Sequence, residues 1–239
     1  MRRALHPVAG LVLLLSGLVP GAARGQTPRE IVDRVDRMMR GNSSRGSCSM
    51  EVQTAHFHRT ITMDVWSLGT TYSLVRVVAP ARDAGTATLK VGNDIWNYLP
   101  RVDRSIRLPA SLMGGSWMGS HFTNDDLVKE SRLVDDYDIA TSFEGDRDGA
   151  PVWEFTLTPK PTAAVVWGRI VEQVRRADLM PQWARYYDED GKLVRTLTFS
   201  DFRTMGGRLV PATMTMVPAD KPGEHTTLHY TTLAFDVGL

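Results

Sequence analysis

The sequence predicts an α+β fold in which one antiparallel sheet curls over a few helices. Strand-like segments with alternating apolar and polar residues follow one another along most of the chain. Short turns rich in Asp and Gly separate these segments. A helix pattern opens the chain and a second one interrupts the strands in the middle. A sheet of so many strands tends to curl, and a curled sheet over two helices leaves an interior.

The N-terminal segment has the features of a targeting signal. Two arginines precede an apolar run, Val8–Val19, which is too short for a comfortable membrane span. Small residues at Gly21–Ala23 suit cleavage. We expect residues 1–25 to be a cleaved signal peptide and residues 26–239 to form a single domain in the periplasm. An uncleaved anchor is the less favoured alternative.

The first helix is predicted from its two ends. Thr27 is a suitable N-cap, Pro28 fits the first turn, and Glu30 lies where a capping box needs its carboxylate. Gly41 ends the helix. Thr123 similarly predicts the start of a second helix over residues 124–132. Between and after these helices, alternation predicts strands at residues 49–54, 59–68, 71–78, 86–91, 95–99, 105–108, 137–144, 152–158, 169–175, 181–188, 193–202, 208–217 and 226–235.

Composition excludes several classes of function. A net charge of +1 gives no electrostatic case for binding nucleic acid or an anionic membrane. Cys48 is the single cysteine, so no internal disulfide forms, and it fits the role of a small buried hydrophobe. The sequence has no nucleophile elbow, no phosphate-binding Gly-Lys motif and no nucleotide fingerprint. We therefore expect a monomer that is not an enzyme and uses no cofactor.

Candidate metal ligands and carboxylate pairs have simpler explanations. His56 and His58 share one strand face, as do His225 and His229. A closed zinc site needs more ligands than such a pair supplies, so surface histidines are favoured and no metal site is expected. The carboxylates of Asp125–Asp126 lie at a predicted helix N-terminus, where their usual role is capping.

The loop before the second helix is the most informative stretch. It carries large apolar side chains between glycines at 114, 115 and 119, which deny it a rigid frame. We expect the loop over Met113–Phe122 to be a mobile lid over an apolar ligand. Its contacting side chains would be Met113, Trp117, Met118 and Phe122.

Apolar residues at alternating strand positions predict the ligand cavity beneath that lid. The chain has 11 methionines and 6 tryptophans, and methionine suits surfaces that accept ligands of variable shape. An ordinary core with partly buried indoles is an equally weighted alternative for any one residue. The predicted cavity residues are Ile61, Met63, Val65, Trp96, Tyr98, Met214, Met216, Leu228 and Tyr230.

Three arginines, Arg101, Arg104 and Arg107, alternate with other residues just before the loop. The favoured interpretation is a solvated strand edge. The alternative is a basic rim that contacts a lipid phosphate or an acidic partner.

Two blocks of the sequence resemble the LolA-like family of outer-membrane lipoprotein-sorting proteins. The second and less specific block runs from Gly207–Pro211 to Met214, Met216 and Val217. The first block comprises Gly85, Ala87, Leu89, Gly92, Ile95, Trp96, Tyr98, Leu99 and Pro100, followed by Met118, Gly119, Ser120, Phe122, Asp126 and Leu127. The resemblance implies a half-open antiparallel β-barrel wrapped over helices, with a hydrophobic cavity for acyl chains. It also implies an important arginine in an early strand, for which Arg59 and Arg76 are candidates.

Together these features predict a periplasmic carrier that binds the acyl chains of lipoproteins or lipids and moves them towards the outer membrane. Its expected partners are those acyl chains and an inner-membrane transporter that hands over the cargo. The first alternative is a lipid-sensing regulatory or accessory protein of a membrane transport or signalling system. The second is a hydrolase of cell-envelope esters, which would need a positioned nucleophile and base.

Overall fold

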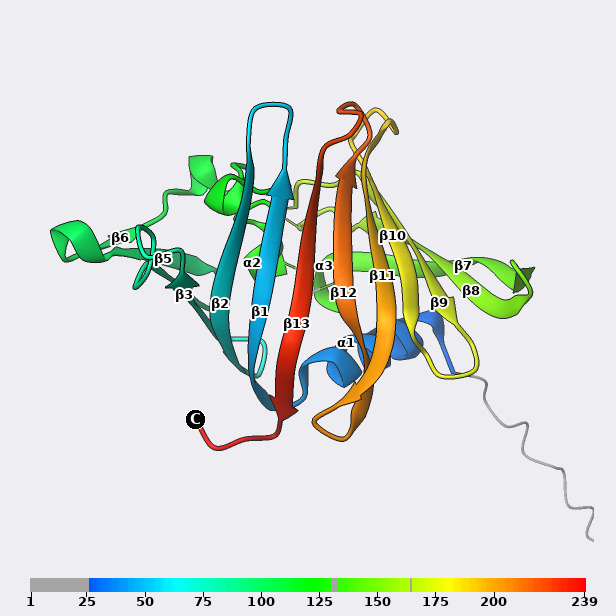
Figure 1. Cartoon of the computed structure of the whole chain (residues 1–239). Coiled ribbons are helices and arrows are strands. Elements are labelled where there is room, and N and C mark those ends of the chain that lie inside the picture. The colour runs from blue at the N-terminus through cyan, green and yellow to red at the C-terminus, as the bar shows by residue number, and fades with distance from the viewer. Residues whose placement is uncertain (1–25, 130–132, 164) are drawn as a thin grey trace, which may run out of the picture.

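One antiparallel sheet of 13 strands forms the body of the protein (Figure 1). The computed structural model describes residues 26–129, 133–163 and 165–239, so the predicted signal peptide lies outside the described residues. From one edge of the sheet to the other, the strands lie in the order β6 to β1 and then β13 to β7. These two runs of consecutive strands meet where β1 pairs with β13. Strands from the two ends of the chain therefore lie side by side at the centre of the sheet.

The strands match the segments that alternation predicts, with small differences at their ends. β1 is the clearest difference, because it begins at Ser43 and not at residue 49. The bounds are β1 (Ser43–Gln53), β2 (His58–Leu68), β3 (Tyr72–Ala79), β4 (Ala87–Val91), β5 (Asp94–Leu99), β6 (Arg104–Arg107), β7 (Tyr137–Arg147), β8 (Ala150–Pro159), β9 (Arg169–Arg175), β10 (Pro181–Tyr187), β11 (Leu193–Met205), β12 (Arg208–Pro218) and β13 (His225–Phe235).

Helix α1 (Pro28–Arg40) has the predicted capping box. The Thr27 hydroxyl accepts a hydrogen bond from the Glu30 backbone N–H at 3.3 Å, and Glu30 Oε2 accepts one from the Thr27 backbone N–H at 2.7 Å. Gly41 ends the helix with φ of 69°, a conformation that glycine adopts without steric cost.

The second helical segment is shorter than predicted. It consists of α2 (Asp126–Lys129) and α3 (Leu133–Asp136), and residues 130–132 between them lie outside the described residues. Thr123 caps α2 as expected, since its hydroxyl accepts from the Asp126 N–H and Asp126 Oδ2 accepts from the Thr123 N–H. Three single 3-10 turns lie in the preceding connections, η1 (Pro100–Val102), η2 (Ala110–Leu112) and η3 (Trp117–Gly119).

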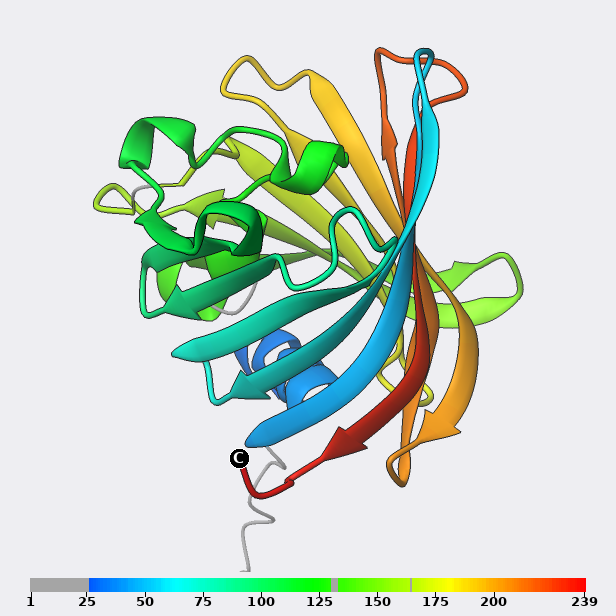
Figure 2. The same ribbon diagram turned by 60° about the vertical axis from the view of Figure 1, so that its left-hand side comes forward.

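The sheet curls, and α1 and the short helices lie on its concave side (Figure 2). It does not close, because β6 and β7 are its two outer edges. Two groups of buried side chains fill the concave side. One joins α1 to β7–β12 around Phe155 and Leu157, and the other joins β1–β3 to Trp117 of the preceding loop. Burial of these apolar faces is the main stabilising contribution to such a fold.

Candidate functional site

Most of the predicted cavity residues gather on the concave face. Met63 and Met216 are fully buried there with Ile61, and each belongs to one of the two core groups. The partly buried side chains of Val65, Met214, Leu228 and Tyr230 pack against them. The alternation of β2, β12 and β13 therefore brings these residues to one side of the sheet.

Trp96 and Tyr98 do not face this side, and for these two residues the predicted placement is wrong. In β5 the fully buried residue is Ile95, and Trp96 is 38% exposed on the opposite face. Both faces of β5 carry large apolar side chains, so alternation alone does not choose the inner one. The predicted inward position of Trp96 rested on this alternation, whereas the pairing with β4 places Ile95 inward opposite the buried Lys90.

Trp96 belongs instead to an apolar row on the convex face. Trp66, Leu74, Leu89 and Trp96 stand opposite one another across β2, β3, β4 and β5. Arg45 and Arg76 lie over the Trp66 ring, with the guanidinium carbons 6.0 and 5.3 Å from its centroid. We call these four apolar side chains the outer apolar row.

A pocket of about 270 Å³ opens on the concave side, near the C-terminal end of α1 and the β2–β3 turn. Apolar side chains form most of its wall, and a group of polar side chains lies at the turn. The apolar and aromatic lining is Val65, Trp66, Tyr72, Val75, Leu127, Pro211, Met214, Tyr230 and Leu233, and the polar lining includes Asp36, Arg40, Ser44, Ser67, Ser73 and Lys90.

A polar cleft of about 600 Å³ adjoins this pocket. The two share Asp36, Arg40 and Gly69, and the cleft continues along the charged face of α1. Arg40 pairs with Asp36 where the two spaces meet, and Arg37 pairs with Asp33 one turn earlier along the helix. The pocket therefore joins apolar walls to a charged opening.

The loop predicted as a lid contributes a core residue. Trp117 is only 4% exposed and packs in the group of Cys48, Met50 and Met63, and its Nε1 donates to Thr88 Oγ1 at 3.2 Å. A mobile lid would add little to the core, and the burial of Trp117 contradicts that expectation for this residue. None of the described residues 113–122 lines the pocket, although Leu127 just beyond them does.

Two arginines on the concave face hold the segment from the loop to α2. Arg59 of β2 donates from Nη2 to the Met118 carbonyl at 2.7 Å. Arg195 of β11 donates to both carboxylate oxygens of Asp126, with Nη1 2.8 Å from Oδ2. Of the two early-strand arginines, Arg59 therefore contacts the loop, whereas Arg76 donates to Asp64.

Arg195 is a site residue that the sequence patterns did not predict. Its guanidinium lies over the rings of Trp167 and Tyr186, with its carbon 4.3 and 4.5 Å from the centroids. The Arg195 and Asp126 side chains are 5% and 14% exposed. The available signal was an arginine at an inward position between Leu193 and Leu197 in an alternating strand.

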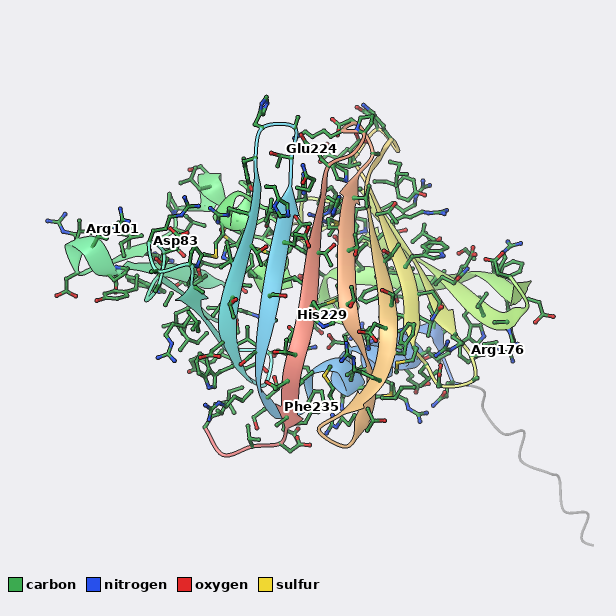
Figure 3. All side chains as sticks on the ribbon, in the orientation of Figure 1. Asp83, Arg101, Arg176, Glu224, His229 and Phe235 are labelled. Carbon is green, nitrogen blue, oxygen red and sulfur yellow. The ribbon has the colours of Figure 1, made fainter. Side chains whose placement is uncertain are left out.

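Glu224 joins the loop to the β1–β2 hairpin at the end of the sheet where Figure 3 labels it. Its Oε2 lies 3.0 Å from His121 Nε2, and its Oε1 accepts from the Ala55 backbone N–H at 3.0 Å. The hydrogen bond from Ala55, followed by that from His121, holds the pKa of Glu224 below its ordinary value. The Glu224 carboxylate therefore links the β1–β2 hairpin to the loop that contains His121, although the two lie far apart in the sequence.

The other candidate residues have ordinary surroundings. His58 pairs with Glu51, and burial raises the pKa of the Cys48 thiol to about 12, so the thiol stays protonated at neutral pH. Arg101 donates to a backbone carbonyl and Arg107 pairs with Asp94 at the exposed β6 edge. Over the described ranges, no three His, Cys, Asp or Glu residues are grouped to hold a metal.

None of the helices in the described part of the chain is long and apolar enough to cross a bilayer.

A family model described as "Uncharacterized protein" matches residues 69–239. No curated protein matches the sequence. Among solved structures, a DUF1329 family protein from Desulfovibrio piger is similar at 26% identity and a TM-score of 0.80, over 90% of this chain and 95% of that one.

Two further solved structures share the fold. A putative outer membrane lipoprotein-sorting protein domain from Vibrio parahaemolyticus is 25% identical with a TM-score of 0.77, over 89% of this chain and 93% of that one. A LolA superfamily protein from Nitrosomonas europaea is 22% identical with a TM-score of 0.76, over 90% of this chain and 96% of that one.

Proposed function

We propose that this chain, which belongs to the uncharacterized-protein family matched above and has the LolA-like fold, is a periplasmic carrier of acyl chains. The observation that carries the proposal is the pocket on the concave face, whose wall is mainly apolar. Transfer of each acyl methylene from water into such a wall is favourable by about 0.8 kcal/mol. Even one short chain would therefore bind usefully.

The periplasmic location rests on the signal-like N-terminus and on the similarity to a lipoprotein-sorting domain. In that compartment a lipid or lipoprotein must be shielded from water between the two membranes. An inner-membrane transporter would supply the cargo, and a competing membrane or receptor would take it up.

The present arrangement is a closed state. Trp117 fills the part of the concave side that lies beyond the pocket, and Arg59 and Arg195 hold the neighbouring backbone and Asp126. Release of these contacts would let the loop lift and uncover the apolar side chains of β1 and β2. The loop over Met113–Phe122 is then a lid, and when it lifts an acyl chain held in the pocket could extend into the space that Trp117 fills.

The test is mass spectrometry of an organic extract from the full chain, purified from the periplasm without detergent. Co-purification of an acyl lipid or acylated peptide in near-stoichiometric amount is expected. A sample that contains no lipid, and that also binds no fluorescent fatty-acid probe, would contradict the carrier function.

A second candidate is a lipid-sensing accessory protein of a membrane system, which the outer apolar row favours. Trp96 and Leu89 are exposed on a face away from the pocket, where a partner could bind them. A photo-crosslinking residue at position 89 distinguishes the two functions. A sensor gives one stable protein adduct in vivo, whereas a carrier gives none at this face.

Catalysis is not part of the proposal. The inward side chains around the pocket include serines but no histidine, and Cys48 is protonated and buried. A hydrolase needs a nucleophile with an adjacent base. Ester hydrolysis by purified protein that a Ser67→Ala change abolishes would overturn this view.

A further inference from the structure

The pocket has a polar ledge that runs across four strands. Ser44 of β1 stands opposite Ser67 of β2, Ser67 opposite Ser73 of β3, and Ser73 opposite Lys90 of β4. All four residues line the pocket, and the Ser44 and Ser67 hydroxyl oxygens are 2.7 Å apart. We call this row the serine–lysine ledge.

An apolar row lies beside the ledge, deeper in the concave face. Val65 and Val75 pair with each other two residues away from Ser67 and Ser73 on the same strands. The two rows give the pocket an apolar side and a polar side in register. Such a surface matches a molecule with a hydrocarbon chain at one end and a hydrogen-bonding group at the other.

Lys90 gives the polar side a positive charge. The residue is only 4% exposed, although lysine is rarely buried so deeply. Its Nζ donates to the Thr70 carbonyl at 2.8 Å, which fixes the ammonium at the β2–β3 turn beside the pocket. An anion that binds here would offset part of the desolvation cost of that charge.

The other charged side chains that line the pocket are Asp36 and Arg40. Asp36 also lines the pocket, but it pairs with Arg40, which lines both the pocket and the cleft. This ion pair is close to neutral as a unit, and the Lys90 ammonium is the cationic group on the ledge itself. The polar cleft of about 600 Å³ continues outward from Arg40 and would accommodate a larger head group or an attached peptide.

We propose that the pocket binds a single-chain amphiphile with an anionic head, carboxylate or phosphate, whose oxygens contact the serine–lysine ledge. The proposal rests on the carrier function and specifies its ligand class. The volume of about 270 Å³ lies just below the usual range for ligand sites, so the pocket takes one acyl chain and not several. The chain lies against Val65, Val75 and Met214, and the head points to the cleft.

The test compares three amphiphiles of equal chain length as competitors of a fluorescent fatty-acid probe. One carries a carboxylate, one a phosphate monoester, and one is the neutral monoacylglycerol. We expect the wild-type chain to bind at least one anionic amphiphile about tenfold more tightly than the neutral one, as one charge-assisted hydrogen bond would provide. Preference between the two anions identifies the head group.

Lys90→Gln should reduce the anionic affinity to the neutral level, and Lys90→Arg should retain the preference. Lys192→Gln, an exposed lysine in the β10–β11 turn, is the matched control and should change nothing. Equal binding of all three amphiphiles by wild type would overturn the head-group proposal and leave the carrier function standing. Failure of every amphiphile and the probe to bind would overturn the carrier function itself. The wild-type comparison decides the proposal even where Lys90→Gln fails to fold.

Discussion

At the scale of single residues, two buried ionisable groups stand out because their charge lies among apolar side chains. Arg195 has an acidic partner in Asp126, whereas the Glu172 Oε1 atom is buried without a hydrogen-bond partner in the described structure. The physical chemistry of a buried charge predicts opposite consequences for the two. Removal of a partner from the first should destabilise the fold, and neutralisation of the second should stabilise it.

Asp126→Ala should lower the free energy of unfolding by about 3–5 kcal/mol, because it leaves the Arg195 guanidinium buried without its carboxylate. Urea unfolding measures the change. Asp94→Ala is the control, since Asp94 and Arg107 form an exposed pair with 43% and 60% exposed side chains. The control should cost at most about 1 kcal/mol. Equal costs for the two variants would contradict this description of the Arg195 site.

Glu172 should make the protein less stable as the pH rises. Burial raises its pKa from 4.5 to about 7, so the folded state binds the proton more tightly than the unfolded chain. Its contribution is fully present below pH 4.5 and is lost as the pH rises through about 7. The loss amounts to about 3 kcal/mol, at 1.36 kcal/mol per pKa unit.

Glu172→Gln should remove this pH dependence. The difference in unfolding free energy between wild type and variant, measured in urea near pH 5 and near pH 8, should favour the variant more at about pH 8. Other titrating groups cancel in this difference because both proteins contain them. A difference that stays constant over the range would show that the carboxylate is not desolvated.

At the scale of elements, sequence patterns located the strands well and assigned their faces less well. Alternation identified β9 at Arg169–Arg175. Asp-Gly turns marked the ends of the neighbouring strands, between β7 and β8 and between β10 and β11. β1 began earlier than predicted because Ser43–Ser47 has no apolar alternation and is ordered by its pairing with β2 and β13. Such long-range pairing is not visible in a local pattern.

The candidate site was predictable to a similar extent. Met63 lies inward between the polar residues Thr62 and Asp64, and Met216 lies inward in a run where Met214 and Met216 alternate with Thr213 and Thr215. The serine–lysine ledge was not foreseen, because serines and a lysine in strands resemble a solvated face until the register across β1–β4 is known. The loop was recognised as unusual from its glycines, but its burial depends on the concave face that receives Trp117.

Trp117→Ala should therefore destabilise the protein by about 3–5 kcal/mol, as expected for loss of a buried aromatic side chain. Trp96→Ala is the matched control, because the indole of Trp96 is 38% exposed on the convex face. The control should cost about 1 kcal/mol or less. Thermal and urea unfolding measure both changes. If Trp117→Ala cost no more than Trp96→Ala, the loop would be a surface lid as the sequence alone suggested.

At the scale of the whole molecule, the curled sheet holds together without covalent or metal links that the described residues reveal. Cys48 is the single cysteine, and no metal-binding group occurs among the described residues. The two halves of the sheet are joined at its centre, where β1 and β13 form a long antiparallel ladder. Stability should thus depend on apolar burial, backbone pairing and buried polar contacts such as the Arg195–Asp126 pair.

Thermal melts of the mature chain should coincide with and without a chelator, and with and without a reductant. The reason is that neither reagent removes an interaction that the fold uses. Differential scanning calorimetry is the measurement, and the matched control is a buffer of equal ionic strength. A fall of several degrees with chelator would indicate a metal site, with His56 and His58 as the first residues to replace.

Movement of the loop relative to the sheet is the remaining property of the whole molecule that the carrier function requires. Arg59 and Arg76 lie in early strands, but only Arg59 faces inward and donates to the Met118 carbonyl, while Arg76 pairs with Asp64 on the convex face. Arg59→Met should therefore raise hydrogen exchange across residues 113–122, because it removes a contact that keeps the loop closed. The same change should tighten binding of a fatty-acid probe several-fold, since a larger fraction of molecules would be open. Arg76→Met, which removes an equal charge, should change neither measurement. If exchange in the loop rose while probe binding stayed constant, the loop would be mobile without being the lid, and the ligand would enter through the polar cleft beside α1.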